Sequence, residues 1–117
     1  MVIDIDGEAV GDISGSSVSL SSDGLTVAIG AIDNDGNCYS SGHVWVFCYK
    51  ADPDIWTQTG LDIEGEAVGD ISGDSVGISS DGLIVALRAD VNNGNGNGSW
   101  SGHVRVFWYK SEIDIWI

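Results

Sequence analysis

The sequence predicts an all-β protein made of two similar units, each a small antiparallel sheet of four strands. Three observations predict this fold class. The nine residues GEAVGDISG occur twice, at 7–15 and at 65–73, and internal repetition is the signature of a repeat architecture. No stretch spaces its apolar residues as a helix does, and Gly and Ser interrupt the chain often. The third candidate strand of each unit is largely apolar on both faces, which indicates sheets covered on both sides.

The repetition covers almost the whole chain. Stretches in the first half recur 58 positions later, and beyond a loop at 33–41 the offset becomes 60. The matching stretches are 21–25 with 79–83, 42–44 with 102–104, and 54–56 with 114–116. The two additional residues fall in the loop at 91–101, where an insertion costs little. We therefore predict a single repeat domain over residues 1–117, with one unit at about 13–63 and another at about 71–117.

Each unit contains four candidate strands in order. Strands are expected at 17–21 and 25–31, and Ser22-Asp23-Gly24 supplies the tight turn between them because Gly accepts a positive φ. A third strand, rich in β-branched and aromatic residues, is expected at 43–50, and a fourth at 54–63. The strands expected in the second unit are 75–79, 83–89, 103–110 and a short fourth strand at 116–117.

The third strand predicts how the sheets are arranged, because successive side chains point to opposite faces. Val44 and Val46 share one face, and Trp45 and Phe47 share the other, so neither face is polar. The second unit repeats this pattern over 103–110. Radial stacking of four-stranded sheets covers both faces of every inner sheet, so we predict that the units are blades of an incomplete β-propeller.

Two blades leave the assembly open. Residues 2–5 match the end of the fourth strand at 60–63, so they are expected to complete the second blade, by strand exchange between copies. Either three or four copies close a ring, or the chain is a fragment and further blades belong to a longer chain. An isolated two-sheet sandwich is a third option.

Three motifs in this order resemble the FG-GAP repeats of integrin α-subunit propellers. The motifs are SGSSV at 14–18 and SGDSV at 72–76, GAI at 30–32, and GHVWVF at 42–47 and GHVRVF at 102–107. The resemblance implies a propeller with an extracellular or cell-surface role in adhesion. Many members of that family hold calcium between their first two strands. Here that connection is only Ser22-Asp23-Gly24, and one carboxylate cannot supply the six to eight oxygens that calcium takes.

The loop at 33–41 is the remaining metal candidate. Asp33, Asp35 and Asn37 form a start of the Asp-x-Asp-Gly kind that calcium loops use. The alternative is an ordinary loop, since the equivalent stretch at 91–95 has no carboxylate and Asn and Asp favour turns. No other cofactor is predicted.

Ligand recognition is expected in the loop at 92–102, which reads NNGNGNGSWSG. Trp100 is the aromatic residue expected to be exposed there, with Asn95 and Asn97 as hydrogen-bonding neighbours. No catalytic residue is predicted, because His43 and His103 occupy the same repeat position and a catalytic group is needed only once. We expect both histidines to be packing or hydrogen-bonding residues.

The charge excludes some classes of partner. The chain has 18 acidic and 4 basic residues, and its net charge of −14 repels phosphate backbones and anionic membranes. Neither nucleic acid nor membrane insertion is therefore expected. The prediction is a non-catalytic, secreted or surface module that binds a protein or glycan ligand. The alternatives are a purely structural repeat that assembles with itself and the remnant of a propeller hydrolase.

Overall fold

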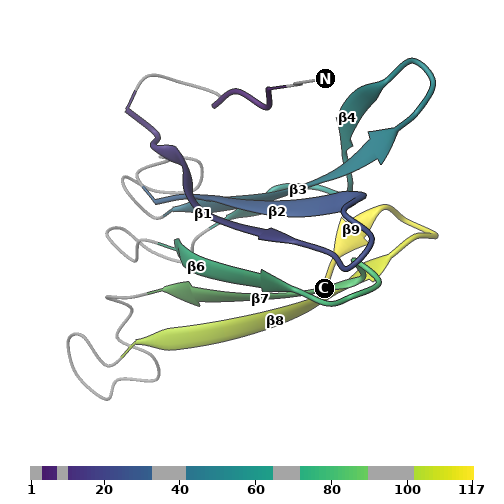
Figure 1. Cartoon of the computed structure of the whole chain (residues 1–117). Helices are drawn as coiled ribbons and strands as arrows, with labels where there is room; N and C mark the ends of the chain where they lie inside the picture. Colours follow the sequence, from purple (N-terminus) through teal and green to yellow (C-terminus); the bar gives the residue numbers. More distant parts are fainter. Residues whose placement is uncertain (1–3, 8–10, 33–41, 65–71, 90–101) are drawn as a thin grey trace.

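The computed structural model describes residues 4–7, 11–32, 42–64, 72–89 and 102–117. Within these ranges there is no helix, and the strands form two antiparallel sheets, which confirms the predicted all-β class (Figure 1). None of the residues in these ranges belongs to a helix of the length and apolarity needed to cross a membrane.

The first sheet follows the chain order β1-β2-β3-β4. Its strands are β1 (Ser14–Leu20), β2 (Thr26–Ala31), β3 (His43–Lys50), β4 (Ile55–Gln58) and β5 (Ile63–Glu64), the last pairing with β3 beyond β4. The predicted fourth strand at 54–63 is therefore wrong as a single element. Between the residues that pair with β3 before and after this break, three residues, 60–62, lie opposite a single residue of β3. Gly60, with φ 74°, turns the chain out of the ladder at this point.

The second sheet has the same order, β6-β7-β8-β9. Its strands are β6 (Ser72–Ile78), β7 (Ile84–Ala89), β8 (His103–Lys110) and β9 (Ile115–Trp116). Both β1 and β6 begin three residues before the predicted starts. The cause is a bulge in each strand, at Gly15 and Gly73, where a positive φ lets the chain continue pairing after a register shift.

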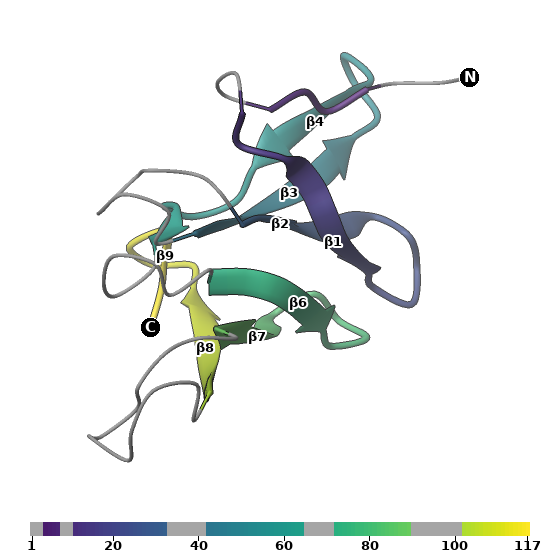
Figure 2. The same ribbon diagram turned by 90° about the vertical axis from the view of Figure 1, so that its left-hand side faces the viewer.

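The two sheets stack face to face and bury a common core (Figures 1 and 2). The first sheet contributes Ala28, Val44, Val46 and Ile63, and the second contributes Val85, Leu87 and Trp116. Full burial of a Val or Leu side chain contributes about 1.5–3 kcal/mol, so this cluster is the main source of cohesion between the sheets.

The two sheets approach each other closely at a glycine on β2. A Cβ atom at Gly30 would lie 2.2 Å from the carbonyl oxygen of Gly73, so no larger residue fits without a shift of β6. The Ser17 hydroxyl donates a hydrogen bond to the same carbonyl oxygen at 2.7 Å, and the Ile78 amide donates to Ser19 Oγ at 3.2 Å. Small residues of the β1–β2 hairpin, Gly30, Ser17 and Ser19, therefore allow direct contact with the backbone of the second sheet.

The face of the first sheet that points away from the second is covered by a second cluster. Val27, Ile29, Ala31 and Trp45 are buried there, and Ile5, Phe47 and Trp56 pack against them. The middle of this face is thus buried, whereas Val18 and Leu20 of β1 remain exposed on it. Of the strand expected at 2–5, the described residues 4 and 5 form no strand, because Ile5 packs on the sheet face instead of joining an edge.

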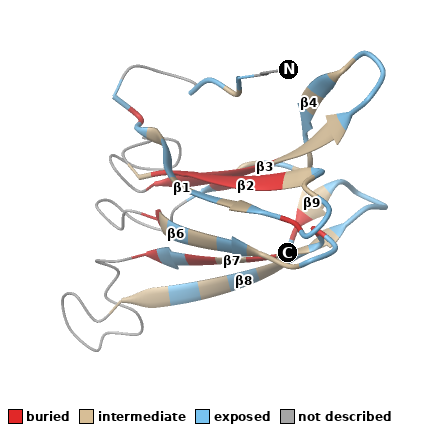
Figure 3. Cartoon of the chain, in the orientation of Figure 1, coloured by how far each residue is buried: buried red, intermediate tan, exposed pale blue. Residues whose placement is uncertain are grey.

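The second sheet departs from the prediction. Val104, Val106 and Trp108 of β8 are 67%, 45% and 53% exposed, so one of its faces lies open in the single chain (Figure 3). The physical reason is that two sheets share one interface, and none of the described residues packs on the far side of β8.

Candidate functional site

The predicted ligand and metal residues lie outside the described residues. This holds for Trp100, Asn95 and Asn97, and likewise for Asp33, Asp35 and Asn37. Among the residues that the structure does describe, no three His, Cys, Asp or Glu side chains come together in a way that could hold a metal ion. The candidate site is therefore sought among the sheets and hairpin turns.

The hairpin turns hold their acidic residues by local hydrogen bonds. Asp23 Oδ1 accepts from the Leu25 amide at 2.9 Å and from Ser21 Oγ at 2.8 Å, and Asp81 is bonded in the same way by its own turn. The Leu25 amide contributes most to lowering the pKa of Asp23 below its ordinary value of 3.8. These bonds assign both carboxylates to the turns, as Ser-x-Asp-Gly predicts.

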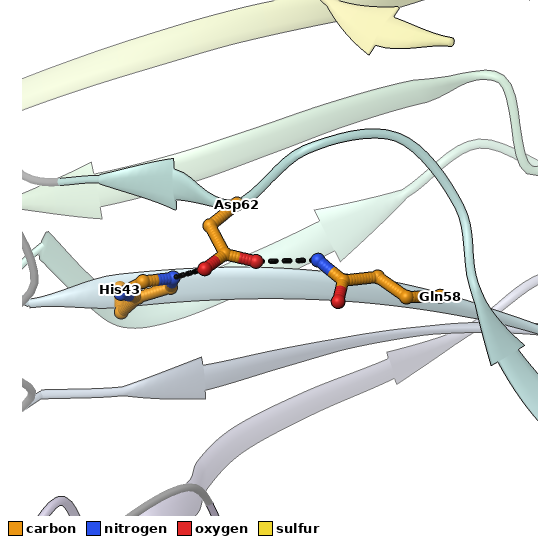
Figure 4. A network of polar contacts seen from close by, with 3 residues as sticks. All are labelled: His43, Gln58 and Asp62. Atoms are coloured by element: carbon orange, nitrogen blue, oxygen red, sulfur yellow. Dashed lines mark hydrogen bonds and ion pairs between the residues drawn. The ribbon is translucent and has the colours of Figure 1, made fainter.

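His43 forms a buried polar contact with Asp62 (Figure 4). Its side chain is only 2% exposed, and its Nε2 lies 2.8 Å from Asp62 Oδ2, while Gln58 Nε2 donates to Asp62 Oδ1. The ring also lies 4.7 Å from that of Trp45, centroid to centroid. Since Asp62 precedes β5, the contact ties that returning segment to β3. A buried imidazole with this partner positions a strand and offers little access to a substrate.

A network of hydrogen bonds joins the residues that follow β4 in the first sheet to β8, β9 and the turn between them in the second. Trp116 Nε1 donates to the Thr59 carbonyl at 2.9 Å, and the Gly60 amide donates to Asp114 Oδ1 at 2.9 Å. Tyr109 donates its hydroxyl proton to the same Asp114 oxygen, and this bond raises the pKa of Tyr109 above its ordinary value of 10.0.

A pocket of about 240 Å³ lies beside this network. Arg105 on its wall donates from Nη1 to the Glu64 carbonyl at 3.0 Å and lies over the Phe107 ring, with Cζ 4.7 Å from the centroid. Ligand pockets usually enclose about 300–1,000 Å³, so this pocket is small for an organic ligand. Its remaining lining is Leu61, Asp62, Ile63, Ile115 and Trp116.

Among the described residues, one feature that these contacts leave unexplained is the uncovered side of the second sheet, which we call the open face. It consists of Val104, Val106 and Trp108 of β8, with Arg88 of β7 at its inner end. The equivalent valines of the first sheet, Val44 and Val46, are 0% and 1% exposed in the core between the sheets. A patch of apolar side chains on the surface of a small protein marks a site of interaction.

The far side of the first sheet, which we call the outer face, complements it. Val18 and Leu20 of β1 are 63% and 61% exposed there, whereas their repeat partners Val76 and Ile78 pack into the core. Each apolar residue of the second sheet in the core, together with Ile63, which packs against them, has an outer-face counterpart of the same kind, whereas Trp45 of the outer face stands at the position of Arg105. The pairs are Val76 with Val18, Ile78 with Leu20, Val85 with Val27, Leu87 with Ile29, Phe107 with Phe47, Tyr109 with Tyr49, Trp116 with Trp56, and Ile63 with Ile5.

Reasoning from the sequence did not single out the open face, although a signal for it exists. Within otherwise matching strands, Arg88 replaces Gly30 and Trp108 replaces Cys48 on the side of the second sheet that the core does not use. On the opposite side, which faces the core, Arg105 replaces Trp45. The two large side chains, Arg88 and Trp108, are the signal that the open face differs from its counterpart in the first sheet.

Comparison with known proteins supplies no function that could be transferred. No family model matches the chain, and no curated protein is significantly similar to it. The two sheet faces are therefore the features on which a function can be based.

Proposed function

We propose that this chain is a non-catalytic structural repeat module that stacks sheet on sheet with further repeats, as the blades of a β-propeller do. One observation carries the proposal: apart from Trp45 at the position of Arg105, the outer face repeats the apolar surface that the second sheet buries against the first. The chain thus carries this interface surface twice and buries only one of the two between its sheets. The other is suited to pack against a further repeat.

The exposed residues support this proposal energetically. Val104 and Val106 stay in water in the single chain, while burial of such a side chain contributes about 1.5–3 kcal/mol. A neighbouring sheet that covered the open face would recover this free energy, as the core does for Val44 and Val46. The buried contact between His43 and Asp62, which orders β5, fits a scaffold better than an enzyme.

The test is a tandem chain in which a second copy follows the first. Ile117 corresponds to Thr57 and Met1 to Thr59, so one linking residue keeps the repeat in phase. We expect the tandem to unfold in one cooperative transition, at a higher urea midpoint than the 117-residue chain. Two independent transitions at the midpoint of the single chain would contradict the proposal.

A second candidate function is recognition of a protein or glycan outside the cell or at its surface. It is supported by the resemblance to FG-GAP repeats and by Trp100 in its Gly- and Asn-rich loop, where a ring can stack on a sugar. Glycan-array binding that disappears on Trp100→Ala and persists on Trp45→Phe, a change in a buried ring, would favour it. An array without binding would leave the structural role as the function to pursue.

A further inference from the structure

We propose that the open face binds the outer face of a second copy of this chain, so that copies associate head to tail. This inference rests on the proposed stacking function and names the partner. It places an interaction surface on each side of the molecule, and the two surfaces are different, so every copy uses one face to receive and the other to dock.

The interface within the chain is the template for this contact. There, Ala28, Val44 and Val46 of the first sheet receive the second sheet. The open face retains this surface, with Ala86, Val104 and Val106 at the equivalent positions. The docking surface is retained as well, because the eight residue pairs of the outer face keep their chemical kind and only Trp45, at the position of Arg105, differs in kind. Repeating the relation between the two sheets therefore brings an open face against an outer face.

The N-terminal segment is already placed for this association. Within the chain, Ile63 pairs with Val44 on the edge of β3 and at the same time packs against the second sheet. Ile5 is its repeat equivalent, and it already packs against the first sheet in the corresponding way. In the head-to-tail contact, Ile5 would lie opposite Val104 of the second copy. In the described part of the chain, no strand pairs with that stretch of the β8 edge.

The same relation adds a polar contact. Asp62 Oδ2 lies 2.8 Å from His43 Nε2 within the chain. Asp4 is the equivalent of Asp62 and is exposed. Its partner in the second copy would be His103, the equivalent of His43, which is half-buried at the start of β8. The contact therefore aligns the edge strand in register as well as covering apolar surface.

Arg88 sets a limit on how closely the copies approach. It occupies the position of Gly30, where a Cβ atom would lie 2.2 Å from a backbone carbonyl oxygen of the neighbouring sheet. The inner end of the contact between copies must therefore be wider than the interface within the chain. The contact then centres on Val106 and Trp108, and removal of the Arg88 side chain is expected to strengthen it.

Pairing of two open faces is the competing arrangement. It would leave Val18 and Leu20 of the outer face exposed in both copies and would give Ile5 no strand to join. Head-to-tail association requires the outer face, whereas pairing of two open faces does not. A substitution on the outer face therefore distinguishes the two arrangements.

The experiment is sedimentation velocity on the full chain and two variants, Val106→Asp on the open face and Val18→Asp on the outer face. Both side chains are exposed, so both variants should fold, which circular dichroism checks. Each variant alone is expected to lose association by about a hundredfold or more, since an unpaired carboxylate would be buried against apolar side chains. Their equimolar mixture is expected to form a heterodimer that grows no further, because each variant keeps one intact face. Ile113→Asp, at a residue 62% exposed in the turn after β8, is the matched control and should associate as the unchanged chain does.

Arg88→Gly provides a gain-of-binding arm and should tighten association about tenfold through the closer approach. A chain that stays monomeric up to millimolar concentration overturns the proposal. Association that survives Val18→Asp overturns it in favour of paired open faces. If the chain is monomeric but the tandem chain gains stability, only the second copy as partner is wrong and the stacking function stands. If the tandem gains nothing, the proposed function itself fails.

Discussion

At the scale of single residues, position 30 and its repeat partner at 88 show how a neighbour determines which side chain is tolerated. Gly30 lies under β6, where a Cβ would be 2.2 Å from the Gly73 carbonyl oxygen and 2.5 Å from Ser17 Oγ. Arg88 faces outward and is 53% exposed, with Nη1 3.6 Å from a carboxylate oxygen of Asp74. The two positions therefore share the same strand backbone because of the repeat. Whether another sheet lies against the position determines how large a side chain fits there.

Gly30→Ala should lower the free energy of unfolding by about 1–3 kcal/mol, because the added methyl group pushes on the backbone of β6. Gly77→Ala is the matched control, since a Cβ at Gly77 would meet no atom within 4 Å and its φ is not positive. Urea titration followed by circular dichroism measures both changes. Equal losses in the two variants would show that the sheets do not approach each other closely at Gly30.

The hairpin carboxylates should titrate below pH 3.8, and the two turns should respond differently to loss of their serine. For Asp81 the Ser79 hydroxyl is the largest cause of the lowered pKa, whereas for Asp23 it is the Leu25 amide. Ser79→Ala should therefore raise the pKa of Asp81 more than Ser21→Ala raises that of Asp23. Carboxyl NMR titration measures both, and equal changes would contradict the prediction.

The same shift predicts how the hairpin turns respond to acid. Because folding lowers the pKa of Asp23 and Asp81, each turn contributes stability above the unfolded pKa of about 3.9, and this contribution is lost as the pH falls through the folded pKa. The loss of stability from this source is therefore confined to pH values below about 4.

At the scale of elements, the short last strand β9 is held by more than its ladder. It pairs with β8 at Tyr109 and Lys110 only, yet its Trp116 is buried and donates from Nε1 to the Thr59 carbonyl in the first sheet. Gly60 makes room for the indole, because a Cβ there would lie 2.7 Å from the ring. The strand is thus fixed by a contact between the two sheets as well as by its backbone bonds to β8, which continue from Ile117 to Trp108.

Trp116→Phe should lower the free energy of unfolding by about 1–3 kcal/mol, because it removes a hydrogen bond, leaves the Thr59 carbonyl without that donor and reduces apolar burial. Trp56→Phe, at the repeat-equivalent position on the outer face, is the control and should cost less because Trp56 is only half-buried. Thermal unfolding of both variants compares the two. A larger cost at Trp56 would show that the core between the sheets is not the main source of stability.

At the scale of the whole molecule, charge opposes association while the faces favour it. Each chain has a net charge of −14, so two copies repel each other over roughly the Debye length, about 10 Å at 0.1 M salt. The open face itself is dominated by apolar side chains, and its charged residues, Arg88 and Asp74, form an ion pair without net charge. Association is therefore limited by long-range repulsion and driven by short-range burial.

Raising the sodium chloride concentration should strengthen self-association, because it screens the repulsion and does not weaken apolar burial. Light scattering at fixed protein concentration, in low and then high salt, measures the change. The Val106→Asp variant serves as the control and should stay monomeric in both conditions. Dissociation of the unchanged chain at high salt would indicate a contact held by ion pairs, contrary to the apolar contact proposed.

Much of the fold could be predicted, and the failures have local causes. The bounds of β3 and β8 were predicted correctly, since β-branched and aromatic residues predominate from His43 to Lys50 and again from His103 to Lys110. The early starts of β1 and β6 were missed because bulges at Gly15 and Gly73 allow pairing on both sides of a glycine. The break before β5 was missed because it depends on Gly60 leaving the ladder and on Asp62 reaching His43.

The sequence by itself determined that the protein is all-β, that it contains two equivalent sheets, and which residues of each strand share a face. These properties follow from the repeat and from alternation, which are local. Only the tertiary structure decided which faces are buried. Val44 and Val104 occupy one repeat position, yet Val44 lies in the core while Val104 is exposed. The physical reason is that burial depends on the neighbour a sheet has, and two sheets in one chain provide each other with a neighbour on one side only.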